Sequence, residues 1–196
     1  SFFTNRVKTL KAALTQLDMD TSAEPEFECV VPGLLLRKDR FDGTSTAFLG
    51  RGASAAVSRG LMLEIIGNTE IRTVVAVKEV QKTGATSERK AMQELLLLKK
   101  KLREVHPNII QIYNVMTTSN CFYVIMQCCS FSMDKQPPEF QDFLHVAGDT
   151  GSSSHAGSFV LTALVQDLLR AIGLLHSKHI MHCDLKVSLL TVTIRG

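Results

Sequence analysis

One stretch decides how the rest of the sequence is interpreted: IRTVVAVKEV, from Ile71 to Val80. β-Branched residues dominate this stretch, as in a buried β-strand, yet Lys78 lies within it. A lone buried ammonium group is costly, so this lysine should face a cleft and meet an anionic partner. The alternative is an edge strand whose lysine reaches solvent through its long side chain. The stretch alone leaves both interpretations open.

A glutamate in the following segment is the best candidate partner for Lys78. Residues 87–104 predict a helix whose apolar stripe consists of Met92, Leu95, Leu96, Leu98 and Leu102. Glu94 lies beside the most apolar part of this stripe, where a carboxylate either borders the stripe or meets a buried cation. Glu88 and Glu104 are rival partners, and an ordinary solvated glutamate is the simplest alternative.

A glycine-rich turn, GRGASAAV from Gly50 to Val57, lies between two predicted strands over 46–49 and 55–63. Glycine lets the backbone approach phosphate oxygens closely and point its N–H groups at negative charge. A hairpin turn without a ligand is the commoner explanation for such a motif. The dinucleotide-binding fingerprint is disfavoured, because a strand and not a helix follows the turn.

The segment HCDLK, from His182 to Lys186, follows a predicted amphipathic helix over 158–177. Asp184 is suited to orient a hydroxyl group and accept its proton. Lys186, two residues later, is suited to neutralise a phosphoryl group during its transfer. The residue types therefore favour phosphoryl-transfer chemistry at this segment.

The remaining segments complete the predicted organisation. Residues 109–116 and 122–128 predict two further strands, so that five strands surround one helix. Residues 4–18 predict an amphipathic helix, and 27–36 predict two short extended pieces. A short helix is expected over 139–145.

Composition excludes several classes of protein. The 196 residues are 45% hydrophobic and 21% charged, which predicts an ordinary globular chain. A formal net charge of +3 is too small to indicate a nucleic-acid or membrane surface, and no apolar run approaches the about 18 residues of a membrane span. Five cysteines without a C-x-x-C pair favour a reducing compartment. We expect a cytoplasmic fragment, or one on the cytosolic face of a membrane if an anchor lies upstream.

Taken in order, these motifs resemble the protein kinases over residues 44–186. The glycine-rich turn is similar to the loop that covers ATP in that family, with Ala55 where a third glycine is usual. Ala76–Lys78 resembles the lysine motif of the third strand, and Glu94 is the best match to its partner on helix C. Leu98, one helical turn later, fits a position of the family's hydrophobic spine, as does His182.

The resemblance continues into the second half of the chain. His106–Ile109 is similar to the turn that commonly follows helix C. Phe122–Cys129 resembles the strand that leads into the hinge, which places Met126 at the gatekeeper position and Gln127 to Cys129 at the adenine edge. Leu174–Lys186 is similar to the approach into the catalytic loop. The turn and the cysteine-bearing hinge also resemble the kinase half of the endoplasmic-reticulum unfolded-protein sensor.

The resemblance implies an α+β, protein-kinase-like fold, with a five-stranded antiparallel N-lobe, helix C and an incomplete helical C-lobe. It implies ATP and Mg²⁺ as cofactors and a protein substrate, and the Asp-Leu-Lys sequence favours serine and threonine as acceptors. The implied catalytic residues are Asp184 and Lys186, and no metal ligand is assigned. The implied nucleotide-binding residues are Gly50, Arg51, Gly52, Ala53, Ser54, Val57, Ala76, Lys78, Glu94, Met126, Gln127 and Cys129.

We divide the sequence into four segments. These are an N-terminal extension over 1–43, a kinase N-lobe with its hinge over 44–129, part of a kinase C-lobe over 130–186, and a non-kinase tail over 187–196. We interpret the tail as a candidate gene-model artefact, because its first two residues, Val-Ser, are what a translated splice-donor sequence would encode. Transcript sequencing that joins Gly196 to a normal downstream exon would exclude this interpretation.

The sequence departs from the family pattern after its central motifs. Cys183 lies where the family usually has an arginine that contacts a phosphorylated activation loop, so we do not expect regulation by that route. Leu189 lies where a metal-binding asparagine is expected, and no Asp-Phe-Gly follows before Gly196. We therefore expect inefficient phosphoryl transfer from this fragment.

Two further interpretations compete with an ATP-dependent Ser/Thr kinase. A pseudokinase or truncated regulatory module would bind nucleotide or a protein partner without turnover, and the absence of Asp-Phe-Gly from a full-length sequence would favour it. A zinc site at His176, His179 and His182 is disfavoured, because three-residue steps place at most two of them on one helix face. We expect no nucleic-acid partner and no membrane contact within the fragment, and the oligomeric state stays open.

Overall fold

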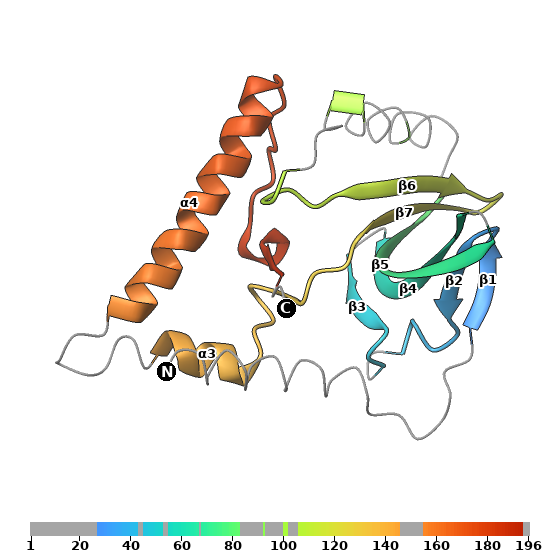
Figure 1. Cartoon of the computed structure of the whole chain (residues 1–196), viewed down its shortest axis with the longest axis horizontal. Helices are drawn as coiled ribbons and strands as arrows, with labels where there is room; N and C mark the ends of the chain where they lie inside the picture. The colour runs from blue at the N-terminus through green and yellow to red at the C-terminus, as the bar shows by residue number, and fades with distance from the viewer. Residues whose placement is uncertain are drawn as a thin grey trace. The chain divides into compact units, whose positions relative to one another are not determined.

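The computed structural model describes residues 27–42, 45–52, 55–66, 68–82, 92, 100–101, 106–145 and 155–193. The chain forms two compact units (Figure 1). The sheet unit comprises residues 18–105 and 110–128, and the helical unit comprises residues 1–17, 106–109 and 129–196.

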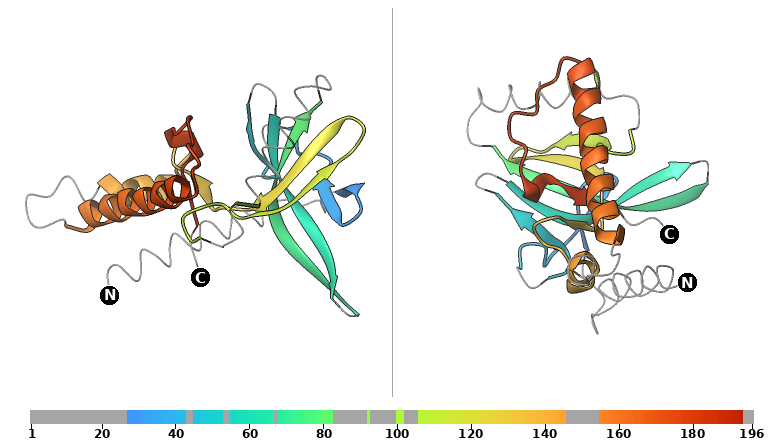
Figure 2. Two further views of the ribbon diagram at one scale, coloured as in Figure 1. Left: turned by 90° about the horizontal axis from the view of Figure 1, so that it is seen from above. Right: turned by 90° about the vertical axis from the view of Figure 1, so that its left-hand side faces the viewer.

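The described part of the sheet unit is one antiparallel sheet of seven strands. Its strands are β1 (Phe27–Val31), β2 (Leu34–Arg37), β3 (Phe48–Arg51), β4 (Ala55–Ile66), β5 (Thr69–Gln81), β6 (Ile112–Thr117) and β7 (Cys121–Gln127). The main order is β1-β2-β4-β5-β7-β6, and β3 pairs with the first half of β4. Figure 2 shows β4 and β5 as a long two-stranded arm that extends past their neighbours.

The five strands predicted between residues 44 and 129 are confirmed as β3 to β7. The two extended pieces predicted over 27–36 are β1 and β2, which form a hairpin across Pro32 and Gly33. Gly33 adopts φ = 81°, a left-handed conformation that favours glycine, and its carbonyl accepts a 2.8 Å bond from the Leu63 amide. The hairpin thereby joins the sheet beside β4, so the sheet has two more strands than predicted.

One apolar core covers one face of this sheet. It consists of Leu34, Leu36, Val75, Val77, Cys121, Tyr123 and Ile125. The hairpin and the central strands approach so closely that Gly60, opposite Leu36, has no space for a side chain. A Cβ atom there would lie 2.6 Å from Leu36 Cδ2 and 2.9 Å from the Leu35 carbonyl oxygen. The N-terminal hairpin is therefore an integral part of the sheet's packing.

The described part of the helical unit has two longer helices and a small sheet. Its elements are β8 (Phe131–Ser132), α3 (Pro138–His145), α4 (His155–Ser177), a short 3₁₀ helix η1 (Val187–Leu189) and β9 (Thr191–Val192). β8 pairs with β9, and the Phe131 and Phe140 rings lie 4.9 Å apart between centroids. The helices predicted over 139–145 and 158–177 are confirmed, although α4 begins three residues earlier than predicted.

The window Val160–Ser177 of α4 is long and apolar enough to cross a membrane by length and composition alone. This is weak evidence, since core helices of soluble proteins pass the same test. The window also carries an ion pair, with Arg170 Nη1 2.9 Å from Asp167 Oδ1. The prediction considered uninterrupted apolar runs, and these two charges interrupt this one.

Two predicted helices fall wholly or largely outside the described residues. The helix expected over 4–18 is outside them. Of the helix expected over 87–104, only Met92, Lys100 and Lys101 are described, and all three are helical.

Candidate functional site

Lys78 lies near the C-terminal end of β5 and points away from the apolar core. Its neighbours Val77 and Glu79 are buried, whereas Lys78 is exposed, because successive residues of a strand face opposite sides. Lys78 pairs with Val57 on β4 and with Val124 on β7. Directly paired residues of antiparallel strands share a face, so these three side chains form a row across the sheet.

The next row across the same face contains Ala76 and Met126, which pair directly. We call Val57, Ala76, Lys78, Val124 and Met126 the Lys78 face. It presents the exposed Lys78 cation beside four apolar side chains, and the partly buried Arg59 pairs with Ala76 in the same row. This combination is suited to a ligand with a flat apolar part and an anionic part.

The glycine-rich turn closes one end of this face. Gly50 pairs with Val57, with an irregular register after Phe48, and Arg51 pairs with Ala56. The Gly52 amide donates a 2.8 Å hydrogen bond to the Ala55 carbonyl, which closes the turn between β3 and β4. Ala53 and Ser54, predicted to bind nucleotide, lie outside the described residues.

The predicted hinge begins where β7 ends. The Gln127 amide donates a 2.9 Å hydrogen bond to the Gln111 carbonyl, which fixes the last residue of the strand within the sheet unit. Cys129, the other predicted adenine-edge residue, belongs to the helical unit. Glu94 lies outside the described residues, so its pairing with Lys78 stays a prediction. Within the described ranges, Lys78 makes no ion pair.

Asp184 and Lys186 lie in an irregular segment of the helical unit, between α4 and η1. Lys186 Nζ is 3.1 Å from Asp184 Oδ2, and both side chains are mostly exposed. Cys183 adopts φ = 59°, a left-handed conformation that is uncommon for a residue with a Cβ atom. Such conformations cluster at functional sites, and this one turns the chain immediately before Asp184.

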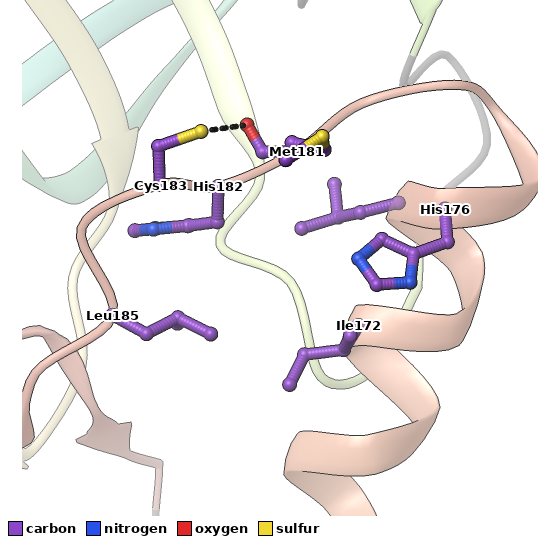
Figure 3. Close-up of a pocket in the computed structure, with 7 residues that line it drawn as sticks. Ile172, His176, Met181, His182, Cys183 and Leu185 are labelled. Carbon is purple, nitrogen blue, oxygen red and sulfur yellow. Dashed lines mark hydrogen bonds between the residues drawn. The ribbon is translucent and has the colours of Figure 1, made fainter.

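An open cavity of about 350 Å³ lies between the end of α4 and this segment. Figure 3 shows its lining residues, and the Cys183 thiol lies 3.6 Å from the Met181 carbonyl oxygen. The lining residues are Ile172, Leu175, His176, Met181, His182, Cys183 and Leu185. His182, predicted to occupy the hydrophobic spine, is exposed and lines this cavity. Leu189, at the expected metal position, lies in η1 and is exposed.

The described residues fit a nucleotide better than they fit a metal ion. The Lys78 face supplies a cation and apolar surface in the sheet unit. No group of three His, Cys, Asp or Glu side chains able to hold a metal ion occurs in the described part of the chain.

A buried polar cluster on the opposite face of β5 was not predicted from the sequence. Glu79 is buried beside Cys121 and Tyr123, and Arg40 approaches it from the N-terminal segment. Burial, and secondarily the Glu79 charge, raise the pKa of the Cys121 thiol, and the same causes raise the pKa of Tyr123 to about 12. The signal was available, because strand alternation places Glu79 on the face of Val75 and Val77.

Comparisons with known proteins agree with the predicted resemblance. The family model of the protein kinase domain matches residues 44–192. Human serine/threonine-protein kinase ULK1 is 26% identical over 147 residues, which cover 75% of this chain. Rat serine/threonine-protein kinase SIK1 is 29% identical over 140 residues, or 70% of this chain, and Saccharomyces cerevisiae serine/threonine-protein kinase ATG1 is 28% identical over 159 residues, or 73% of it.

The chain spans only a small part of these relatives. The matched region covers 12% of ULK1, 15% of SIK1 and 17% of ATG1. The family match begins after the β1–β2 hairpin and extends through β9, beyond Lys186. The nature of residues 187–196 and the likeness to the unfolded-protein sensor both stay predictions.

Proposed function

Because this chain belongs to the protein kinase family, we propose that its sheet unit binds ATP on the Lys78 face, and that the longer protein phosphorylates serine or threonine side chains. The predicted family and the predicted fold, an antiparallel-sheet N-lobe with few helices, are confirmed. One observation supports the nucleotide site most directly. Lys78 is exposed on a face where it lies between Val57 and Val124, while the residues before and after it are buried.

Within the sheet unit, each predicted residue has a distinct role. Lys78 would attract the α- and β-phosphates, and the backbone amides of the Gly50–Gly52 turn would lie against the phosphate chain. Val57, Ala76 and Met126 would offer the apolar surface on which the adenine ring packs. Glu94 would hold the Lys78 ammonium group in place, as the family resemblance implies.

Within the helical unit, Asp184 would orient the acceptor hydroxyl and accept its proton. Lys186, now 3.1 Å from the Asp184 carboxylate, would leave that partner and approach the transferred phosphoryl group. When bound with ATP, Mg²⁺ neutralises phosphate charge. The five cysteines of the described ranges form no disulfide, which is consistent with our proposal of a cytosolic location.

A second function has its own supporting observation. Leu189 supplies no metal ligand where an asparagine is expected, so a module that binds nucleotide or a protein partner without turnover is the alternative. A kinase and a nucleotide-binding module share the Lys78 face and differ only in phosphoryl transfer.

Nucleotide binding is tested by thermal unfolding of the full chain with ATP or ADP, with and without Mg²⁺. We expect nucleotide to raise the unfolding midpoint of the parent but not that of Lys78→Met. Arg72→Met is the matched control, because Arg72 is also an exposed cation of β5, at its far end. This control should respond to nucleotide like the parent. An unchanged midpoint in the parent, or an equal response in Lys78→Met, would contradict the proposal.

Turnover is tested by phosphate transfer from labelled ATP to a Ser/Thr peptide library. An active kinase should lose about 10²- to 10⁴-fold in rate on Asp184→Asn, since this change removes the general base. A parent that binds ATP but transfers no more phosphate than Asp184→Asn would establish the alternative for this chain.

A further inference from the structure

Consecutive residues of β5 serve opposite faces of the sheet. Lys78 lies on the Lys78 face, where we propose that ATP binds. Glu79 lies on the opposite face, in the core, where it is 7% exposed. The peptide between them is held on both sides, because Lys78 pairs with Val57 and Val124 and Glu79 pairs with Ala56 and Tyr123. A displacement of either residue therefore moves the other.

The Glu79 carboxylate makes three contacts from the core side. Its Oε2 atom is 3.4 Å from Arg40 Nε, and its Oε1 atom is 3.2 Å from Gln81 Nε2 and 3.6 Å from Cys121 Sγ. Only Arg40 brings a positive charge to this set. A buried carboxylate depends on such a charge, because uncompensated burial of an ion is strongly unfavourable.

Arg40 is itself fixed by the N-terminal segment. Its Nη1 atom forms an ion pair with Glu28 and lies 3.2 Å from the Arg37 carbonyl oxygen. Its guanidinium carbon is 4.4 Å from the centroid of the Phe41 ring, and the residue is only 8% exposed. Arg40 and these partners all precede residue 44, where the protein kinase match begins.

We propose that Arg40 is a positioning residue for Lys78. By compensating the buried charge of Glu79, it keeps β5 in its position in the sheet and the lysine directed at nucleotide. This inference rests on the proposed function. Without Arg40, the free energy of the Glu79 carboxylate falls when it moves toward water. β5 must shift or twist to allow this movement. The shift displaces Lys78, although no atom of Arg40 lies on the Lys78 face.

The competing explanation is a purely structural ion pair. In that case, loss of Arg40 lowers the stability of the sheet but leaves the nucleotide affinity of the folded protein unchanged. The two explanations therefore differ in affinity measured well below the unfolding midpoint, and not in the midpoint itself.

The test is titration calorimetry of the full chain with Mg²⁺–ATP, at a temperature where every variant is folded. We expect Arg40→Met to weaken the affinity by about 3- to 30-fold. Adding Glu79→Gln removes the uncompensated charge, so Arg40→Met with Glu79→Gln should recover an affinity within about twofold of the parent. The control is Leu34→Ala, which removes fully buried packing from the same face and should lower the midpoint without changing the affinity.

An Arg40→Met affinity equal to that of the parent, or no recovery in the double variant, overturns the inference. An equal loss of affinity in Leu34→Ala also overturns it, because any destabilisation of the sheet would then weaken nucleotide binding as much as the loss of Arg40 does. Should Arg40→Met not fold, Arg40→Lys replaces it, since one ammonium group cannot serve both Glu28 and Glu79. We then expect a loss of about threefold that Glu79→Gln again removes. A parent that binds no Mg²⁺–ATP overturns the proposed function together with this inference, whereas normal binding by Arg40→Met overturns this inference alone.

Discussion

The two units of this chain differ in how they bury their apolar side chains. In the sheet unit, Leu34, Leu36, Val75, Val77 and Ile125 have no significant exposure. In the helical unit, α4 leaves Leu161 and Leu169 59% and 61% exposed, and Ala171 is its one buried hydrophobic residue in the described range. Lys78 is thus held by a strand with partners on both sides, whereas Asp184 and Lys186 lie in an irregular, exposed segment. Substitutions should therefore be costly in the sheet and nearly neutral on α4.

The largest contrast is expected from truncating one aliphatic side chain in each unit. Ile125→Ala should lower the free energy of unfolding by about 2–5 kcal/mol, because it leaves a cavity in the centre of the core. Leu169→Ala on α4 should change it by less than about 0.5 kcal/mol, since that side chain is largely exposed. Chemical denaturation followed by circular dichroism measures both. Equal losses would break the contrast between the units.

A glycine in each unit provides the next test. Gly60→Ala should cost about 1–3 kcal/mol, because the added Cβ meets the Leu35 carbonyl oxygen at 2.9 Å, and a backbone atom cannot move aside cheaply. Gly173→Ala on α4 should instead stabilise by about 0.5–1 kcal/mol, since no described atom outside the neighbouring helix backbone lies within 4 Å of its added Cβ and alanine favours the helix. The midpoints of thermal unfolding of the two variants should shift in opposite directions from that of the parent. A shift of the same sign in both would show that α4 is packed as tightly as the sheet.

Alkaline pH should affect stability through the sheet core. Burial, and then the Glu79 charge, raise the pKa of Tyr123 from its ordinary value of 10.0 to about 12. The unfolded chain therefore loses this proton first, so the stability that the neutral phenol contributes falls as pH rises from about 10 to about 12. Tyr123→Phe should flatten the dependence of the unfolding midpoint on pH in this window. Parallel curves for variant and parent would contradict a buried phenol.

The smallest effect is expected from the exposed ion pair on α4. Arg170→Ala should cost only about 0.3–0.5 kcal/mol, because both members of the Asp167–Arg170 pair are solvated and lie one helical turn apart. The midpoint measured in low and in high salt should differ less for the variant than for the parent. A cost comparable with that of Ile125→Ala would mean that α4 has a buried environment.

The sequence predicted those parts of the fold that depend on local patterns. β-Branched residues identified β5, and the amphipathic repeat identified α4, because each signal lies within one element. The sequence left open whether Lys78 faces a cleft or lies on an edge strand, and the pairing of β5 with both β4 and β7 excludes the edge strand. The pairing of β2 with β4 did not follow from the sequence, since Leu36 and Gly60 are far apart in sequence and no turn motif connects them.

The buried polar cluster was missed for a related reason. Arg40 lies in a charged run, Arg37 to Asp42, which is a pattern typical of a solvated turn. Its contact with Glu79 spans 39 residues, and only the folded sheet brings the two together. The predicted Lys78–Glu94 pair is of the same non-local kind, and it stays a prediction because Glu94 lies outside the described residues.

The N-terminal hairpin has a practical consequence for choosing expression boundaries. A recombinant chain cut at residue 44, where family similarity begins, would lose β1 and β2 and leave Gly60 to Met62 of β4 as an open edge. An unprotected edge of apolar strand invites pairing with other chains, and therefore aggregation. Boundaries drawn from family similarity alone would then produce insoluble protein, and the failure would be mistaken for intrinsic instability of the domain. Starting upstream of Phe27 retains the strands that cover this edge.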